Sequence, residues 1–251
     1  MRCRVFPIDS QPSFTGSMAS FKTHMVTSSL LGIGYGAAAY VGYDVPLSTC
    51  MLAGGLCSVS GMLPDIDSNT GVPIRESMAF AAAVVPMLMI DRFQHMGLNN
   101  ESIVLAGALI YLLIRFGLPE LLKRFTVHRG MWHSVPAAAI AGLLAFMICS
   151  CEDMNLRLFK SGGVLAGYVS HLLLDELFSV EWYRGRLRMK KSFGTALKMW
   201  GKTPWANITT YGKLTALVVL AVGDPLFMEN HGFHPPSAHH AAHEEPNHQV
   251  D

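Results

Sequence analysis

The sequence predicts an all-α protein, folded as a polytopic bundle of about five to seven transmembrane helices. Of its 251 residues, 51% are hydrophobic and only 15% are charged, and the mean hydropathy is +0.32. Soluble domains carry about 25% charged residues, so this composition favours a membrane protein. The second observation is a series of apolar segments along the chain, several of them near the length of a membrane span. The formal net charge of +1 gives no global basic field, so direct binding to nucleic acid is not predicted.

Seven segments are candidate spans, because a spanning helix needs about 20 mostly apolar residues. In chain order they cover 25–43, 46–63, 77–90, 102–118, 134–150, 161–178 and 211–228. Several are short and the third contains Pro86, so tilted, interfacial or re-entrant helices are alternatives to full spans. Small residues in the first two segments suit close helix packing in lipid: Gly32, Gly34, Gly36, Gly54 and Gly55.

The membrane-embedded domain is predicted to run from residue 21 to residue 228, with a basic cytoplasmic segment at about 181–210. Residues 1–20 lack the apolar core of a signal peptide and are expected to be disordered, and Met18 is a second candidate start of translation. Residues 229–251 are rich in His, and a disordered tail is favoured there over a loose metal site. Cys50 and Cys57 lie in an apolar segment, where a small hydrophobic role is favoured over a metal or disulfide role.

Basic residues are distributed very unequally between the two sides of the predicted bundle. Sixteen fall on the side of the N-terminus: Arg2, Arg4, Lys22, Arg75, Arg115, Lys123, Arg124, Arg129, Arg184, Arg186, Arg188, Lys190, Lys191, Lys198, Lys202 and Lys213. Three fall on the other side: Arg92, Arg157 and Lys160. Cytoplasmic loops carry the excess of Lys and Arg, so the N-terminus is predicted inside and the His-rich tail outside. The stretch "YRGRLRMKK" then lies at the cytoplasmic surface, where it either meets anionic lipid or only sets the topology.

Four clusters of His and Asp map to the same predicted membrane face. They are His24 in "KTHM", Asp65 and Asp67 in "LPDID", His128 and His133 in "HRGMWHS", and His171 and Asp175 in "SHLLLD". Each cluster alone has a simpler explanation, such as a packing histidine or a solvated loop carboxylate. Ionisable residues in membrane segments are costly unless they are paired, so four clusters at one level favour a single shared site.

The spacing within each cluster indicates its geometry. His171 and Asp175 are four residues apart, so on a helix they lie on one face, one turn apart. The two aspartates follow Pro64 and are expected in an extended loop, with their carboxylates pointing opposite ways. His128 and His133 converge best if Gly130 interrupts the helix and "HRGMWHS" forms a turn. Imidazole with carboxylate suits zinc, manganese or iron, and no cysteine lies near these motifs to favour a thiolate site.

The ordered motifs "H…LPDID…HRGMWHS…GYVSHLLLD" resemble those of the YdjM-type family of bacterial inner-membrane proteins. The resemblance extends from about His24 to the segment around Trp205. It implies a membrane-bound metal-dependent hydrolase, and some members of the family are linked to the LexA-regulated response to DNA damage. The family pattern falls on His24, Asp65, Asp67, His128, Arg129, His133, His171 and Asp175. The order of these residues is also loosely similar to that of zinc-dependent phospholipase C and related nucleases.

We therefore expect a multi-pass protein of the bacterial inner membrane that hydrolyses an ester or phosphoester, lipid-like because the site lies at the bilayer surface. The expected cofactor is a divalent metal, with zinc favoured over manganese or iron, and membrane lipids are expected partners. The predicted metal ligands are His24, Asp65, His128, His171 and Asp175. His133 and Asp67 are predicted as a ligand, a support for a ligand or a general base, and Arg129 as the group that holds a substrate anion.

Two alternatives use the same residues differently. A metal or proton transporter would use the carboxylates and imidazoles as a pathway, with its ligands near the midplane of the membrane on broken helices. A non-enzymatic adaptor would recruit a cytoplasmic partner through the basic segment. The position of the His/Asp clusters at the ends of the predicted spans favours a surface site over a transport pathway.

Overall fold

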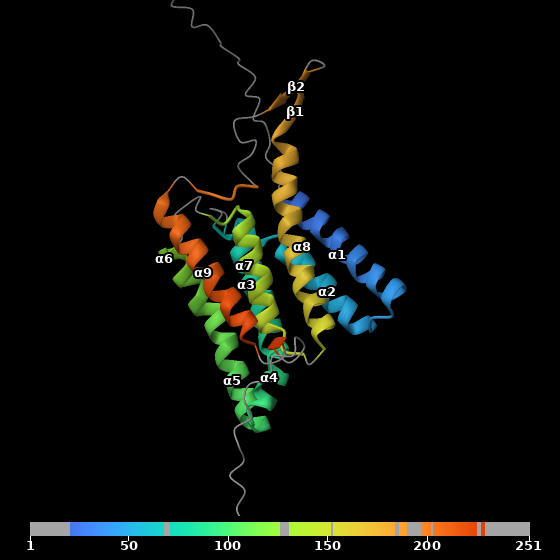
Figure 1. Ribbon diagram of the computed structural model, residues 1–251, viewed down its shortest axis with the longest axis vertical. Coiled ribbons are helices and arrows are strands. Elements are labelled where there is room, and N and C mark those ends of the chain that lie inside the picture. Colours follow the sequence, from blue (N-terminus) through green and yellow to red (C-terminus); the bar gives the residue numbers. More distant parts are fainter. Residues whose placement is uncertain are drawn as a thin grey trace, which may run out of the picture.

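The chain folds into a bundle of helices with one short β-hairpin at one end (Figure 1). The computed structural model describes residues 21–67, 71–125, 131–151, 153–183, 186–189, 197–201, 203–224 and 227–228. The helical elements are α1 (Phe21–Tyr43), α2 (Leu47–Ser60), the 3-10 helix η1 (Leu63–Asp67), α3 (Val72–Leu88), α4 (Ile90–His95), α5 (Asn100–Leu112), the π-helical segment η2 (Leu113–Gly117), α6 (Leu118–Phe125), α7 (Val135–Ile148), α8 (Met154–Phe178) and α9 (Pro204–Val222). The antiparallel hairpin pairs β1 (Val180–Tyr183) with β2 (Arg186–Met189).

The predicted fold class is confirmed, and each of the seven predicted spans contains a helix. Within the described part of the chain, three helical stretches are long and apolar enough to cross a membrane: Val72–His95, Asn100–Leu122 and Pro204–Val222. The count of five to seven spans is thus not reached by length and hydropathy. The helices α2 and α7 have only 14 residues each, and the long helix α8 buries polar side chains such as Arg157 and His171.

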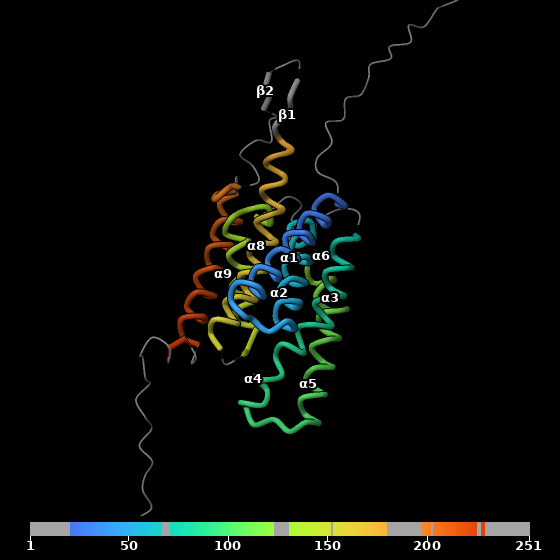
Figure 2. The backbone as a smooth tube through the Cα atoms, turned by 90° about the vertical axis from the view of Figure 1, so that its right-hand side faces the viewer, coloured from blue at the N-terminus to red at the C-terminus, as the bar shows by residue number. Residues whose placement is uncertain are grey.

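The helix α8 forms the centre of the bundle. It contacts the pair α1 and α2 on one side and α7 on the other, while α9 packs on α7 (Figure 2). The remaining helices α3, α4, α5 and α6 form a second layer, in which α3 contacts the other three. A core of Ala138, Tyr168 and Leu172 joins α7 to α8. Predicted His and Asp residues meet where α1, α2 and α8 converge.

Close contacts between backbones hold α1, α2 and α8 together. A Cβ on Gly32 would lie 2.3 Å from the carbonyl oxygen of Gly54, and a Cβ on Gly167 would lie 2.0 Å from that of Cys57. Neither position has room for a side chain, because real Cβ atoms do not approach an oxygen so closely. Glycine at these points allows the helix backbones to touch, as small residues do in membrane bundles.

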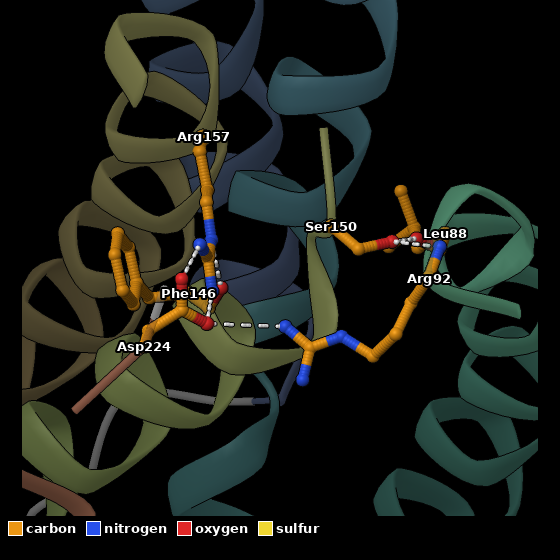
Figure 3. A network of polar contacts seen from close by, with 6 residues as sticks. All are labelled: Leu88, Arg92, Phe146, Ser150, Arg157 and Asp224. Atoms are coloured by element: carbon orange, nitrogen blue, oxygen red, sulfur yellow. Dashed lines mark hydrogen bonds and ion pairs between the residues drawn. The ribbon is translucent and has the colours of Figure 1, made fainter. Parts of the chain in front are cut away.

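At the end of the bundle away from the hairpin, a buried ion pair ties α8 to Asp224, two residues after the end of α9. The guanidinium of Arg157 donates to both carboxylate oxygens of Asp224, at 2.7 and 2.8 Å, and its Nε donates to the carbonyl oxygen of Phe146 at 2.7 Å (Figure 3). Arg92 of α4 reaches the same carboxylate at 3.3 Å. Two of the three basic residues that the sequence assigned to this side, Arg92 and Arg157, are therefore paired with Asp224.

Two local structures differ from the sequence-based expectations. The segment "LPDID" is the 3-10 helix η1 and not the extended loop expected after Pro64. Its backbone continues from the turn after α2, where the amide of Asp65 donates to the carbonyl oxygen of Met62 at 3.2 Å. The basic segment at about 181–210 begins with the β-hairpin, which the sequence analysis did not predict. The Arg and Lys residues of this segment hide the alternation of apolar and polar residues that is typical of a strand.

Candidate metal centre

Five of the predicted site residues come together at the end of the bundle that carries the hairpin. They come from four separate elements: His24 from α1, Asp65 from η1, His133 from the turn before α7, and His171 and Asp175 from α8. The pair on α8 lies one helical turn apart on one face, as its spacing predicts. The site therefore depends on the packing of α1, α2, α7 and α8 and not on a single motif.

The ion-pair contacts within the cluster each join an imidazole nitrogen to a carboxylate oxygen. His24 Nε2 lies 3.2 Å from Asp175 Oδ1, and the other oxygen of Asp175 lies 3.5 Å from His171 Nε2 and 3.7 Å from His133 Nε2. Asp65 Oδ1 lies 3.5 Å from His133 Nε2 and 3.7 Å from His171 Nε2. Donor atoms that share a metal at about 2.1 Å are separated by similar distances. The carboxylate of Asp175 thus faces His24 with one oxygen and the other two histidines with its second oxygen.

The orientation of His171 is fixed by the backbone. Its Nδ1 lies 2.7 Å from the carbonyl oxygen of Gly61, which can only accept a hydrogen bond, so Nδ1 carries the proton and donates. In a neutral imidazole the other nitrogen, Nε2, then has a free lone pair. This atom is buried, has no hydrogen-bond partner, and faces the carboxylates of Asp65 and Asp175. Ligand histidines of metal sites are typically oriented in this way, with one nitrogen bound to a carbonyl group.

The three histidines are packed against one another. The rings of His24 and His171 are stacked, with their centroids 3.7 Å apart and an interplanar angle of 17°. The ring of His133 is tilted by 60° relative to His171, at a centroid distance of 5.5 Å. The Nδ1 atom of His24 is also buried without a hydrogen-bond partner. Two unsatisfied imidazole nitrogens in a buried cluster cost free energy, unless a cation satisfies them.

The turn that carries His133 is fixed on both sides of this residue. Ser134 caps α7, since its side chain accepts a hydrogen bond from the amide of Ala137 at 3.3 Å. On the other side, the hydroxyl of Tyr168 donates to the carbonyl oxygen of Trp132. Tyr168 lies three residues before His171 on α8, about one helical turn away. The turn is therefore held at the same level of the bundle as His171.

The cluster is closed on one side and open on the other. His24 and His171 are buried, whereas the side chains of Asp65 and His133 are 27% and 28% exposed. Burial raises the pKa of the Asp65 carboxyl, but the hydrogen bond from His133 and the electrostatic interactions with His171, His133 and His24 outweigh it and hold this pKa below its usual value. Asp65 and His133 thus form the solvent-exposed rim of the cluster.

For three predicted site residues the structure gives no side-chain position. His128 and Arg129 lie outside the described residues, and Asp67 is described only as the last residue of η1. Two supporting groups were not predicted at all: the carbonyl oxygen of Gly61 and the hydroxyl of Tyr168. Every residue has a backbone carbonyl, so residue type cannot indicate which carbonyl supports a ligand. A tyrosine within an apolar segment is typical of a hydrophobic core. No pattern in the sequence could therefore have identified these two groups.

The donor set fits a divalent metal. Two overlapping groups, His24 with Asp65 and His171, and His133 with His171 and Asp175, each place three ligand atoms within 4.8 Å of one another. All the donors are imidazole nitrogens and carboxylate oxygens, which suit zinc, manganese or iron. The unsatisfied Nε2 of His171 belongs to both groups, so it is the atom on which the site would be centred.

A comparison with protein families identifies the chain over most of its length. The model of the YdjM inner membrane protein family matches residues 18–222, a range that includes every residue of the cluster. No curated protein and no solved structure matches the chain. The match agrees with the apolar helices, which place the protein in a membrane. The chain therefore belongs to the YdjM inner membrane protein family.

Proposed function

We propose that the protein is a membrane-bound, metal-dependent hydrolase of an ester or phosphoester. The observation that carries this proposal is the buried Nε2 of His171, which faces two carboxylates while its other nitrogen is committed to Gly61. A lone pair beside carboxylate oxygens is repelled by them, and a cation between them would remove that repulsion. A divalent cation held there would act as a Lewis acid on water and on the ester oxygen.

The residues of the chain have distinct roles in this proposal. His24, Asp65, His171 and Asp175 would hold the cation, with His128 as a further candidate ligand. His133 lies at the open rim with its Nε2 3.5 Å from Asp65, where it can take a proton from an attacking water or complete the ligand set. Asp67 is the alternative base, and Arg129 would bind the negative charge of the substrate. Zinc is the first choice of metal and manganese or iron the alternatives.

The position of these residues along α8 supports a site near one surface of the bilayer. His171 and Asp175 lie in the last two turns of α8, and Arg157 lies in its first turn, about 21 Å away from His171 along the helix axis. A transporter would be expected to hold its ligands near the midplane on broken helices, whereas α8 is continuous through the site. The excess of Lys and Arg on this side would make it the cytoplasmic face of a bacterial inner membrane.

Metal analysis tests the proposal directly. The purified wild-type protein is expected to retain a divalent metal that the double variant His171→Ala, Asp175→Ala has lost. A matched control is available in α4, where Asp91 and His95 form another Asp/His pair at the same spacing. The variant Asp91→Ala, His95→Ala should keep the metal. Equal metal content in the wild type and the α8 variant would refute the proposal.

A further inference from the structure

A group of exposed aromatic and apolar side chains lies where α9 begins. We call Met199, Trp200, Trp205 and Ile208 the aromatic collar; Trp200 is 68% exposed and Trp205 is 71% exposed. All four tryptophans of the chain fall between residues 132 and 205. Trp and Tyr are enriched where a membrane protein passes through the headgroup layer, because their rings are amphipathic. The collar is therefore suited to the interface between lipid and water.

The collar is held rigidly by hydrogen bonds to the backbone. The side chain of Asn207 accepts from the amide of Gly201 at 2.6 Å and donates to its carbonyl oxygen at 3.0 Å. The hydroxyl of Tyr211 donates to the carbonyl oxygen of Met199 at 2.8 Å, and its ring packs on Trp200 with centroids 4.7 Å apart. These contacts hold the turn before α9 in one conformation. The backbone of the turn is therefore tied to the first two turns of α9, and the four side chains of the collar are exposed there.

Direct contacts place the collar at the level of the metal centre. The carbonyl oxygen of Lys198 accepts a hydrogen bond from the amide of Val135 at 3.3 Å, two residues after His133. The turn with His133 is in turn held to α8 through the bond from Tyr168 to Trp132. Figure 1 shows the start of α9 at the same end of the bundle as the start of α1, which carries His24. The depth of the collar in the bilayer therefore sets the depth of the site.

The composition of the adjoining segment favours an anionic membrane surface. Residues 180–203 contain seven Lys and Arg residues and a single acidic residue, Glu181. Basic residues next to a membrane surface are attracted to the negative charge of anionic lipid. Aromatic side chains that enter the headgroup layer and basic residues beside them are complementary to a phospholipid leaflet.

We infer that the aromatic collar seats the metal centre at the depth of the lipid phosphates. If the proposed hydrolase function holds, its substrate is then a phosphoester of a lipid in the same leaflet, and not a soluble ester. The open rim of Asp65 and His133 is the side from which such a headgroup reaches the site. The chemistry that the site meets at this depth is a phosphodiester with a glycerol ester beside it.

Depth-dependent quenching of tryptophan fluorescence tests where the collar lies. The full-length protein is placed in nanodiscs of phosphatidylcholine and phosphatidylglycerol, with Trp132, Trp182 and Trp205 replaced by Phe so that Trp200 alone reports. Lipids brominated near the glycerol are expected to quench Trp200 more than lipids brominated near the chain ends, and aqueous acrylamide should quench it weakly. Strong quenching by acrylamide with none by either lipid overturns the inference.

A second measurement avoids the triple substitution. The wild-type chain labelled with 5-fluorotryptophan gives fluorine resonances that single Trp→Phe variants assign, and a spin label on the lipid headgroup should broaden those of Trp200 and Trp205 most. Broadening no stronger than that produced by a soluble spin label overturns the inference. Neither measurement depends on bound metal or on activity.

A comparison of two substrates tests the lipid assignment. The metal-loaded protein is assayed on phosphatidylglycerol in nanodiscs and on a water-soluble aryl phosphodiester. Trp200→Ala, Trp205→Ala should lower the rate on the lipid by about tenfold or more, as expected for two large side chains removed from the headgroup layer, and leave the soluble reaction unchanged. Tyr43→Ala removes an exposed aromatic at the far end of α1 and is the control.

The outcomes separate the two proposals. Equal losses on both substrates, or hydrolysis of the soluble compound alone, overturn the lipid assignment. If lipids brominated near the glycerol quench Trp200 but neither substrate is hydrolysed, the hydrolase proposal is refuted. The inferred depth of the site at the lipid phosphates is then supported. If neither brominated lipid quenches Trp200, the inferred depth of the site is overturned, whether or not the protein hydrolyses either substrate.

Discussion

The Nδ1 atom of His171 lies 2.7 Å from the carbonyl oxygen of Gly61, across a separation of 110 residues in the sequence. This hydrogen bond assigns the proton of the imidazole to one nitrogen and leaves the other free to face Asp65 and Asp175. Gly61 follows α2 directly, and η1 with Asp65 begins two residues later. The same short stretch therefore orients a histidine and supplies a carboxylate, so the register between α2 and α8 determines the geometry of the site.

Gly167→Ala should disturb that register. The added Cβ would meet the carbonyl oxygen of Cys57 and the hydroxyl of Ser60, so α8 must move away from α2. We expect a loss of about 1–3 kcal/mol in the free energy of unfolding, as for other overpacked positions, and weaker metal binding. The control is Gly212→Ala in α9, where a Cβ meets nothing within 4 Å and should be neutral or stabilising. Unchanged metal affinity in Gly167→Ala would show that the register does not set the site.

Tyr168→Phe should weaken metal binding through the position of His133. The substitution removes the hydrogen bond to Trp132 and keeps the ring in the core, so a loss of about 1 kcal/mol in stability is expected. Tyr35→Phe is a matched control, because Tyr35 donates to the carbonyl oxygen of Phe159 near the other end of α8. Isothermal titration with zinc should give a weaker affinity for Tyr168→Phe alone. The same affinity for both variants would contradict the role assigned to Tyr168.

Asp224→Ala should destabilise the protein without removing metal. It leaves Arg157, whose side chain is fully buried, without its bidentate partner. Breaking a buried ion pair in this way costs about 3–5 kcal/mol, which thermal unfolding in detergent would detect. Glu76→Ala removes the partner of an exposed pair with Arg75 and should change stability by about 0–1 kcal/mol. Loss of metal from Asp224→Ala while it remains folded would mean that the two ends of α8 are coupled.

The lowered pKa of Asp65 predicts how stability depends on pH in metal-free protein. A carboxyl whose pKa is lower in the folded state than its unfolded value of about 3.9 stabilises the fold above that value. The contribution is lost as the pH falls through the lower, folded pKa. Unfolding temperatures of the wild type and Asp65→Asn should therefore differ at pH 6 and converge toward pH 3. A difference that stays constant over this range would show that Asp65 is not stabilised by its histidine neighbours.

Much of the site could be anticipated because its signals are local. His171 and Asp175 lie on one face because a helix repeats every 3.6 residues, and the count of Lys and Arg placed the clusters at one end of the bundle. The segment "LPDID" was expected to be extended, and this was wrong because the turn after α2 continues into η1. A local pattern cannot show whether a short segment between helices is extended or helical when tertiary contacts on both sides constrain it.

The sequence by itself determined that the chain is an apolar helical protein, and it indicated that His24, Asp65, His133, His171 and Asp175 share one end. Only the tertiary structure decided which groups these residues meet. The partner of His171 is a backbone carbonyl 110 residues away, and Arg157 finds Asp224 across 67 residues. Hydropathy and spacing describe neighbours along the chain, whereas these partners are set by how closely glycine-containing helices pack. The unsatisfied Nε2 of His171, on which the proposed metal centre rests, exists because that packing fixes the other nitrogen.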